Sequence, residues 1–366
     1  MISLAGTPDT AMIDQPWPAG ELESLDHCPY CGSFDRHIAH RDVQDWSFYN
    51  APGKWTYWGC NQCNSLYLSP RPSRRSVSLA YKSYYTHRID RREPLRHRIR
   101  ERFRNEYWSI WLGADFRPRI HLPRWLRWIL RPLKSQLSEP FVLQELARMP
   151  VGRLMDIGCG SGNLLRLAKG LGWKAVGLEV DGAAVQAARA RGLDVIEGSY
   201  SRLAEYQGEW DCIICSHVLE HVHEPVEMLA DVATALRPGG ILLLSSPNAT
   251  SRVRAHFGDD WRGLEAPRHL SIPSLRQLKA NLSDIGFCTR QVLQRPIATA
   301  IESARIQRRS TRVTRRDLTV ERMLSNRIVF SSGDDYDFLE LVCVKGADLA
   351  ATPLAVRLSS TDYVKE

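Results

Sequence analysis

The sequence predicts an α/β protein, built on a doubly wound and mostly parallel sheet, with a small cysteine-rich module in front of it. From residue 153 onward, short apolar runs alternate with helical segments, several of which end at a glycine. Before that point, two Cys-x-x-Cys pairs are separated by 28 residues. The 366 residues are 43% hydrophobic and 25% charged, a composition that excludes wholesale disorder and fibrous repeats.

The positive charge lies in one segment. The chain has a net charge of +8, but residues 86–135 hold 14 Arg and Lys against five acids, a net charge of +9, so the remainder is close to neutral. Apolar runs are as short as Ile241–Leu244, far below the roughly 18 residues of a membrane-spanning helix. Residues 1–26 contain five acids and no basic residue, unlike a signal peptide. We therefore expect a cytoplasmic protein with a flexible tail over residues 1–26.

The two Cys-x-x-Cys pairs predict a structural zinc site. Each pair lets two thiolates bind one ion from a tight turn, and two pairs complete a tetrahedral, closed site. Short strands over Thr56–Trp58 and Ser65–Leu68 bracket the second pair, as in a zinc ribbon. A redox motif or disulfides would need a βαβ context or an oxidising compartment. The histidines at 27, 37 and 40 are not required. The predicted ligands are Cys28, Cys31, Cys60 and Cys63.

Cys212 and Cys215 have the same spacing but a different setting. They lie in the apolar run Asp211–Cys215, where positions three apart on a strand point to opposite faces. We therefore interpret them as core residues.

The order of elements after residue 153 defines the main domain. A closing antiparallel strand is expected over Asp337–Lys345, after an Arg-rich helical insertion over Ala298–Ile328. Ligands of such a domain bind at the carboxyl ends of the strands. The expected strands are Leu154–Ile157, Lys174–Val180, Leu193–Glu197, Asp211–Cys215 and Ile241–Ser246, and the expected helices are Asn163–Lys169, Gly182–Arg191 and Pro225–Leu236.

The sequence of the loop after the first strand distinguishes between two classes of cofactor. It reads G-x-G-x-G over Gly158, Gly160 and Gly162, whereas a dinucleotide fold uses G-x-G-x-x-G. Asp156 precedes it, and an acid there favours a cationic ligand over a pyrophosphate. Glu179 follows 21 residues after Gly158, where a carboxylate can bind ribose hydroxyls. A nucleoside that carries an amino acid and a sulfonium fits better than NAD.

These residues resemble the class I S-adenosylmethionine-dependent methyltransferases. The segment from Asp156 to Gly162 looks like their first motif, Glu179 like their ribose-binding acid, and residues 236–240 like the turn before their fifth strand. Residues 216–225 (SHVLEHVHEP) are similar to the signature of the subgroup that includes ubiquinone-biosynthesis O-methyltransferases. The resemblance implies S-adenosylmethionine as cofactor, bound by Asp156, Gly158, Gly160, Gly162, Glu179, Ser199, Ser216 and His217.

The resemblance continues outside this core. Residues 261–270 (WRGLEAPRHL), a helix near Ser274–Ile285 and then Gly286-Phe287 look like the region after the fifth strand of that subgroup. The order of cysteine module, residues 66–72 and a tyrosine-rich stretch at Tyr81–Tyr85 is similar to bacterial methyltransferases of glycan and natural-product pathways. One departure concerns the adenine base: where many members carry an acid, this chain has Gly198-Ser199-Tyr200, so Ser199, a backbone group or packing must serve.

Methyl transfer requires positioning and, for a hydroxyl acceptor, a base. His217, His221, His223 and Glu220 follow the fourth strand, and His269 lies in a later loop; we predict His221 and His269 as the catalytic pair. Alternatively these histidines only orient their loops. His217 and His221 would form a zinc pair if helical, but no third ligand is evident at motif spacing, so no catalytic metal is predicted.

The basic segment allows three interpretations. Residues 122–134 carry a leucine and tryptophan stripe with arginines largely elsewhere, and Pro123 and Pro132 limit the helix. Such a helix packs as a lid, lies on an anionic membrane at its inner face, or binds single-stranded RNA.

The sequence divides into a tail (1–26), a zinc ribbon (27–74), a basic helical connector or lid (75–140), a seven-stranded Rossmann-like methyltransferase domain (141–346) and a C-terminal tail (347–366). We predict an enzyme that methylates oxygen or carbon of a small molecule, such as a sugar or lipid-linked glycan intermediate. The alternative is an RNA-modifying methyltransferase that holds RNA with the ribbon and the basic helix.

Overall fold

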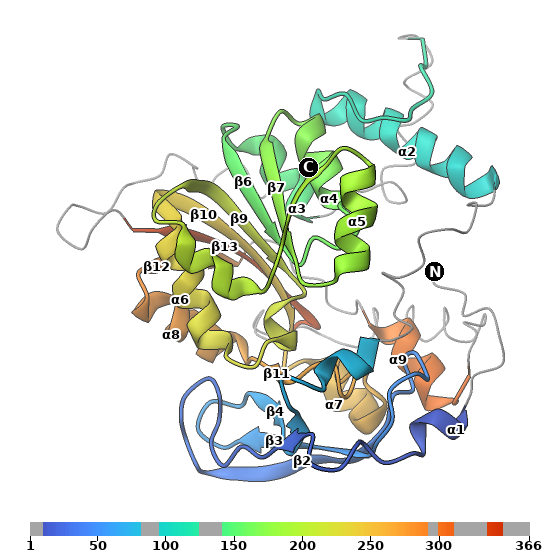
Figure 1. Ribbon diagram of the computed structural model, residues 1–366, viewed down its shortest axis with the longest axis vertical. Helices are drawn as coiled ribbons and strands as arrows, with labels where there is room; N and C mark the ends of the chain where they lie inside the picture. The colour runs from blue at the N-terminus through green and yellow to red at the C-terminus, as the bar shows by residue number, and fades with distance from the viewer. Residues whose placement is uncertain (1–9, 82–94, 124–140, 292–298, 311–334, 347–366) are drawn as a thin grey trace.

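A computed structural model describes residues 10–81, 95–123, 141–291, 299–310 and 335–346. Its centre is a seven-stranded sheet in the order β12-β13-β10-β9-β6-β7-β8 (Figure 1). Within this sheet β13 runs antiparallel to both of its neighbours, and the strands from β10 to β8 are parallel. The strands are β6 (Arg153–Ile157), β7 (Lys174–Glu179), β8 (Asp194–Glu197), β9 (Trp210–Ser216), β10 (Leu236–Pro247), β12 (Phe287–Gln291) and β13 (Phe338–Lys345).

This topology confirms the predicted fold class. The five parallel strands and the antiparallel closing strand lie where the sequence places them, within a few residues, while β12 is an additional strand. Helices cover both faces, with α3, α4 and α5 against one apolar cluster and α6 and α8 against the other. The helices are α3 (Phe141–Arg148), α4 (Asn163–Gly170), α5 (Gly182–Ala190), α6 (Pro225–Ala235) and α8 (Leu275–Asp284), with 3₁₀ turns η4 (Tyr200–Glu205) and η5 (Leu219–His221).

Cys212 and Cys215 show how the sheet divides the core. Both are fully buried, but Cys212 packs in the cluster under α4 and α5, whereas Cys215 packs in the cluster under α6. This confirms that they are core residues on opposite faces of β9.

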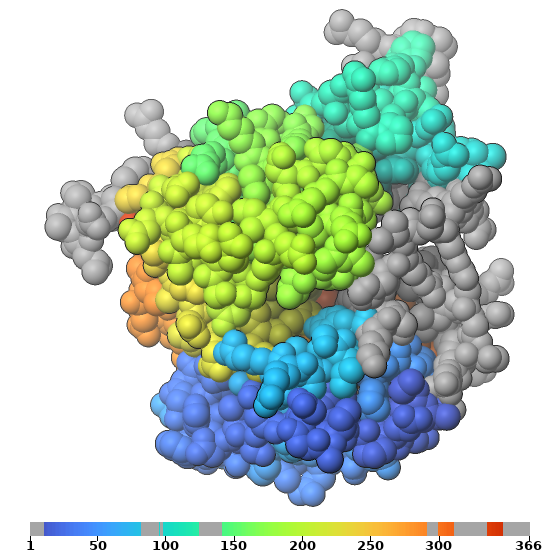
Figure 2. Space-filling model, in the orientation of Figure 1, coloured from blue at the N-terminus to red at the C-terminus, as the bar shows by residue number. Residues whose placement is uncertain are grey.

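The N-terminal module forms a second sheet in the order β11-β4-β3-β2. Its fourth strand, β11, does not belong to the module in sequence, because it comes from the loop that follows β10. In Figure 2 the blue module and the yellow part of the main domain meet along a continuous seam. The strands are β2 (Arg36–Val43), β3 (Trp55–Cys60), β4 (Leu66–Leu68) and β11 (Ser271–Ile272), and a separate pair joins β1 (Leu22–Glu23) to β5 (Arg71–Pro72).

The remaining elements flank these two sheets. Helix α2 lies at the end of the main domain away from the ribbon (Figure 1), and Arg166 of α4 forms an ion pair with its Glu101. No helix among the described residues is long and apolar enough to cross a membrane. These elements are α1 (Thr10–Ile13), η1 (Val77–Tyr81), α2 (Leu95–Leu112), α7 (Arg252–Phe257), η6 (Gly258–Asp260) and α9 (Ala300–Gln307).

The predicted flexible tail over residues 1–26 is wrong for residues 10–26. Ile13 and Trp17 are buried, and the Trp17 indole donates a hydrogen bond to the Ser76 hydroxyl, 3.2 Å away. The free energy of these two large apolar side chains is lower when they are buried than when they are exposed to water. The predicted C-terminal tail, the stripe over residues 124–134 and most of the insertion over 298–328 lie outside the described residues.

A buried ion pair joins the two sheets. Arg268, from the loop before β11, and Asp45, from the loop between β2 and β3, have fully buried side chains and form a salt bridge. Asp45 also accepts hydrogen bonds from the backbone amides of Phe48, Asn50 and Ala51. The loop and the module are therefore fixed to each other by charge as well as by strand pairing.

Asp45→Ala should lower the unfolding free energy by about 3–5 kcal/mol, because it leaves the Arg268 guanidinium buried without its main counter-charge. Thermal unfolding followed by circular dichroism should show a fall in Tm of about 10 °C. Glu205→Ala is the matched control, since Glu205 pairs with Arg202 where both side chains are about half exposed, and it should change stability by less than about 1 kcal/mol. Equal Tm values for the two variants would show that the buried pair does not hold the sheets together.

Candidate functional site

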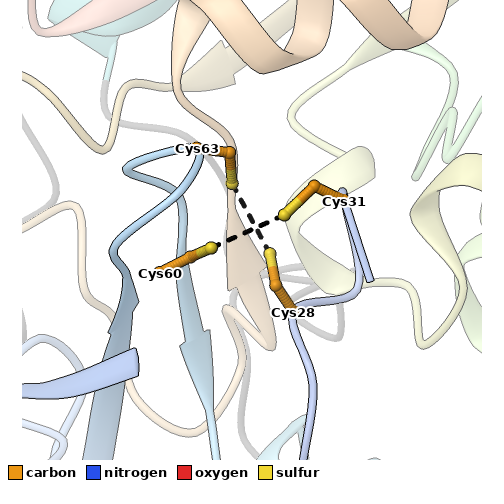
Figure 3. Close-up of side chains that lie close together, drawn as sticks. All are labelled: Cys28, Cys31, Cys60 and Cys63. Atoms are coloured by element: carbon orange, nitrogen blue, oxygen red, sulfur yellow. Dashed lines mark hydrogen bonds between the residues drawn. The ribbon is translucent and has the colours of Figure 1, made fainter. Parts of the chain in front are cut away.

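The four predicted zinc ligands converge at one end of the ribbon (Figure 3). The Sγ atoms of Cys28 and Cys63 are 3.6 Å apart, and those of Cys31 and Cys60 are 3.5 Å apart. A tetrahedral zinc ion with Zn–S bonds of about 2.3 Å separates its sulfur ligands by about 3.8 Å. The four cysteines therefore fit a closed structural zinc site.

The two turns that carry these cysteines have the same geometry. In the first, the Gly32 amide donates to the carbonyl of Cys28, and in the second the Asn64 amide donates to that of Cys60, both at 2.9 Å. Gly32 and Asn64 have φ of +71° and +61°, a region that glycine and asparagine tolerate best. The sequence pattern Cys-x-x-Cys-Gly/Asn thus specifies both halves of the site.

The glycine-rich loop joins the carboxyl end of β6 to α4. Gly158, Gly160 and Gly162 all have positive φ, and a Cβ on Gly158 would meet the side chain of Val218. This conformation turns the Gly160 amide toward Glu179, whose Oε2 accepts its hydrogen bond at 2.7 Å. The loop is therefore held in a fixed shape at the edge of the sheet where ligands bind.

Glu179 sits at the carboxyl end of β7 and is nearly buried. Its Oε1 accepts hydrogen bonds from the amides of Val180 and Asp181 at 2.8 and 2.9 Å. Together with the Gly160 amide, these use three of the roughly four acceptor positions of a carboxylate. Oε2 thus remains the oxygen that can accept a hydrogen bond from a ligand hydroxyl.

Asp156 lies beneath the glycine-rich loop, on β6. Burial, with a smaller contribution from the charge of Glu179, raises the pKa of Asp156 to about 8. A cationic group placed nearby would favour its ionised form, which agrees with the predicted preference for a positively charged ligand.

The remaining predicted cofactor residues surround the same edge. Ser216 ends β9 and is half-buried, while Ser199 is exposed after β8 and its hydroxyl lies 2.6 Å from that of Ser201. His217 has a positive φ of 56°, and its ring meets that of Phe338 edge to face at 4.7 Å. All the predicted cofactor-binding residues lie on β6, β7 or β9 or follow β6, β8 or β9 in the chain.

His221 and His269 are 48 positions apart in sequence but adjacent in space. Their ring centroids are 4.7 Å apart, and the rings are nearly perpendicular. His221 belongs to η5, just after β9, and the Leu270 amide donates to the carbonyl of Glu220 at 2.7 Å. The structure therefore brings together the two histidines that the sequence selects as the catalytic pair.

The hydrogen bonds of these histidines identify their free nitrogen atoms. His221 Nδ1 lies 3.0 Å from the carbonyl oxygen of Arg268, and His269 Nδ1 lies 2.7 Å from that of Gly263. Because a carbonyl can only accept, a hydrogen bond to it places the hydrogen on Nδ1 and the lone pair on Nε2. This fixes the tautomer of His269, whereas His221 Nδ1 also lies 2.9 Å from the Tyr81 hydroxyl, which can either donate or accept. Burial lowers the pKa of His269 to about 4, against the opposing charge of Glu265, so its ring is neutral at physiological pH.

Three further residues surround this pair: Glu220 was among the candidates after the fourth strand, whereas Tyr81 and Glu265 were not. The Tyr81 hydroxyl lies 2.9 Å from His221 Nδ1. Glu265 is buried, which by itself would raise its pKa, but the charges of Arg262 and Arg268 outweigh this effect and lower it. Glu220 is fully buried as well. The sequence shows the tyrosine-rich stretch and the acidic residue beside His221, but it does not indicate how close they lie in space.

The ribbon holds the loop that carries His269. The Tyr57 hydroxyl shares its hydrogen between the carbonyls of Leu264 and His269, at 2.5 and 2.6 Å. Ser274 caps α8 and donates to the carbonyl of Cys63 at 2.5 Å. The zinc module is thus part of the structure that positions His269.

Comparisons with known proteins agree with this architecture. Residues 122–292 match a family model described as a methyltransferase domain. The ubiquinone biosynthesis O-methyltransferase of Xanthomonas campestris pv. campestris (strain B100) is 31% identical over 109 residues, which are 28% of this chain and 46% of the relative. A probable S-adenosylmethionine-dependent methyltransferase of Mycolicibacterium smegmatis is 32% identical over 110 residues, 29% of this chain and 43% of the relative.

A solved structure of a SAM-dependent methyltransferase from Archaeoglobus fulgidus covers 60% of this chain and 99% of its own, with 20% identity and a TM-score of 0.40. The chain spans about half the length of the curated relatives that it matches. By its sheet topology, its glycine-rich loop and the matched family model, the chain contains a methyltransferase domain of the class that uses S-adenosylmethionine.

Cys60→Ser should remove the zinc ion that withstands dialysis against a chelator, since three thiolates hold the ion less tightly than four. Elemental analysis after dialysis should give about one zinc ion per chain for the wild type. Cys288→Ser is the control, because Cys288 lies exposed on β12. Retention of the resistant ion by Cys60→Ser would refute the four-cysteine site.

Asp156→Asn should stabilise the protein progressively as the pH rises from about 4 to about 8. In this window the folded wild type retains a proton on Asp156, whose pKa is about 8, while the unfolded carboxyl loses it, so wild-type stability declines with pH. Urea unfolding at pH 5 and pH 8 should show a larger gain at pH 8. The exposed Asp194 on β8 supplies the control variant, Asp194→Asn; an equal gain at both pH values for Asp156→Asn would contradict the raised pKa.

Proposed function

We propose that the protein transfers a methyl group from S-adenosylmethionine to an oxygen or carbon atom of a small molecule, in particular a sugar or a lipid-linked glycan intermediate. The supporting observation is the position of the His221–His269 pair, which follows β9 and β10 at the same sheet edge as the Glu179-bound glycine loop. A methyl donor held by the loop would then lie near a proton acceptor.

The residues of the loop fit the cofactor. Oε2 of Glu179 accepts a ribose hydroxyl, and Asp156 lies near the place of a cationic amino group or sulfonium. S-adenosylmethionine supplies an activated methyl group on a sulfonium. In the reaction the S–CH₃ bond breaks as the bond from the acceptor oxygen to the methyl carbon forms, and the acceptor hydroxyl loses its proton to a base.

His221 is the better placed of the two candidate bases. Its Nδ1 hydrogen is directed to the Arg268 carbonyl, so its Nε2 lone pair can accept a proton, while the Tyr81 hydroxyl beside Nδ1 supports the orientation of the ring. His269, with its pKa near 4, is a weak base at neutral pH. Its role is then to orient the acceptor or to accept a hydrogen bond through its lone pair.

The ribbon supports a small-molecule acceptor over RNA. Its outer strand β4 pairs with β11, and its cysteines pack against the core of the main domain. This part of the module therefore forms an internal contact and is not a surface for RNA. The names of the curated relatives favour oxygen as the methylated atom. Peripheral contact with the inner face of a membrane, through residues 122–134, belongs to the same proposal for a lipid-linked acceptor.

The test of this function is calorimetric titration with S-adenosylhomocysteine. Wild type should bind, and Glu179→Ala should bind about 100-fold more weakly, because it loses a charged hydrogen-bond acceptor and the support of the loop. Asp194→Ala, at the opposite end of the neighbouring strand, is the control. Equal affinities of wild type and Glu179→Ala would remove the ribose assignment.

The RNA alternative is tested on the same samples. Binding of a labelled oligouridine that weakens steeply and linearly on a log-log plot against salt would favour the RNA-modifying enzyme. Absence of such binding, with S-adenosylhomocysteine bound, would favour the small-molecule acceptor.

A further inference from the structure

A second cluster of ligating side chains lies beside the methyl-acceptor face of the site. One ligand atom each from Glu220, His221 and His269 lie within 4.8 Å of one another. Glu220 and His221 come from η5, and His269 comes from the loop that the ribbon holds. The set is two imidazoles and one carboxylate, which is the ligand set of many open transition-metal sites.

The first reason to assign a ligand here is an unsatisfied carboxylate oxygen. Oε1 of Glu220 lies 3.2 Å from Nδ1 of His217, but Oε2 is buried and has no hydrogen-bond partner among the residues that the structure describes. A buried carboxylate oxygen without a donor costs free energy of order 1–3 kcal/mol or more. A bound cation would remove this cost.

The second reason is the orientation of the histidines. His269 Nδ1 lies 2.7 Å from the Gly263 carbonyl, which leaves the lone pair of this ring on Nε2. Metal-bound histidines characteristically donate their other ring N–H to a carbonyl or carboxylate in this way, and the bond fixes both tautomer and ring orientation. His269 is therefore oriented as a ligand, and His221 has the same orientation when its Nδ1 donates to the Arg268 carbonyl, 3.0 Å away, rather than accepting from the Tyr81 hydroxyl.

The third reason is the charge around the cluster. Oε2 of Glu265 lies 3.5 Å from Nε2 of His269 and also forms an ion pair with Arg262, while Arg268 pairs with both Asp45 and Glu265. The charges of these carboxylates and guanidiniums thus cancel one another, whereas none of these guanidiniums is paired with Glu220. A divalent ion bound to Glu220 would keep one positive charge for an anionic acceptor oxygen.

We propose that Glu220, His221 and His269 form a site for a divalent transition-metal ion, with Zn²⁺ as its expected occupant, that binds the oxygen of the methyl acceptor. The three ligand atoms lie within 4.8 Å of one another. Metal–ligand bonds of about 2.1 Å require ligand atoms to be roughly 3–4 Å apart, so only a small movement is needed. Three protein ligands leave a coordination position open, in contrast to the closed four-cysteine site.

The role of this ion rests on the proposed function. The acceptor hydroxyl would bind the ion at the open position, and its proton would be lost to water at a lower pH than without the metal. The resulting oxygen anion then attacks the methyl carbon as the S–CH₃ bond breaks. This arrangement replaces His221 as the base of the proposed reaction: His221 and His269 hold the metal, and water takes the proton.

The experiment counts metal ions on the full-length protein. A mild chelator first removes any metal from the Glu220, His221 and His269 site and leaves the cysteine-bound zinc in place. Co²⁺ is then added as a spectroscopic probe. Wild type should take up about one Co²⁺ per chain with weak visible d–d bands and no intense thiolate charge-transfer band, since the proposed ligands are nitrogen and oxygen.

Glu220→Gln and His269→Ala should each reduce Co²⁺ uptake from about one ion to less than about one-tenth of an ion per chain under the same conditions, because each removes one of three ligands. His256→Ala, which removes an exposed histidine on α7, should leave uptake unchanged. Circular dichroism and the resistant zinc ion report whether each variant is folded. Wild type without Co²⁺ uptake, or Glu220→Gln with full uptake, would overturn the metal site.

Titration with S-adenosylhomocysteine on the same preparations separates the two proposals. Nucleoside binding without Co²⁺ uptake removes the metal site and leaves the proposed function standing. Co²⁺ uptake by the three residues without nucleoside binding confirms the metal site and removes its role in methyl transfer.

Discussion

The structure depends on the pairing of Ser271 and Ile272 with Tyr67 and Leu66. This short antiparallel contact completes the ribbon sheet with a strand from the main domain. The buried Arg268–Asp45 pair and the Tyr57 hydroxyl fix the same loop from the ribbon side. Burial makes these polar contacts strong, because each would leave an uncompensated group if its partner were lost.

That junction explains why the zinc module is relevant to the site. A closed four-thiolate zinc site has no free coordination position for chemistry, but its second turn accepts the hydrogen bond of Ser274, which caps α8. His269 lies between this cap and the Tyr57 contact. A zinc ion bound to these cysteines would therefore stabilise a small module whose sheet, in turn, orients His269.

The two halves of the site have different electrostatic designs. Around the glycine-rich loop, Asp156 and Glu179 place two carboxylates near each other, and burial raises the pKa of Asp156 to about 8. Around the histidine pair, Glu265 is neutralised by Arg262 and Arg268, while Glu220 retains an oxygen for which the described residues supply no donor. Both halves hold buried acids that cost stability in the folded chain, which is characteristic of sites organised for ligands.

The sequence alone determined the main sheet, the four-cysteine cluster and the glycine-rich loop, because these depend on local periodicity and on residues close together in the chain. The sequence named His221 and His269 as a candidate pair, and Glu220 as a candidate beside His221, but not the contact that brings His269 to the other two. That contact joins residues 48 positions apart, and it exists because β11 adds to the ribbon. Strand addition between distant segments leaves no spacing in the sequence, so only the tertiary structure decided it.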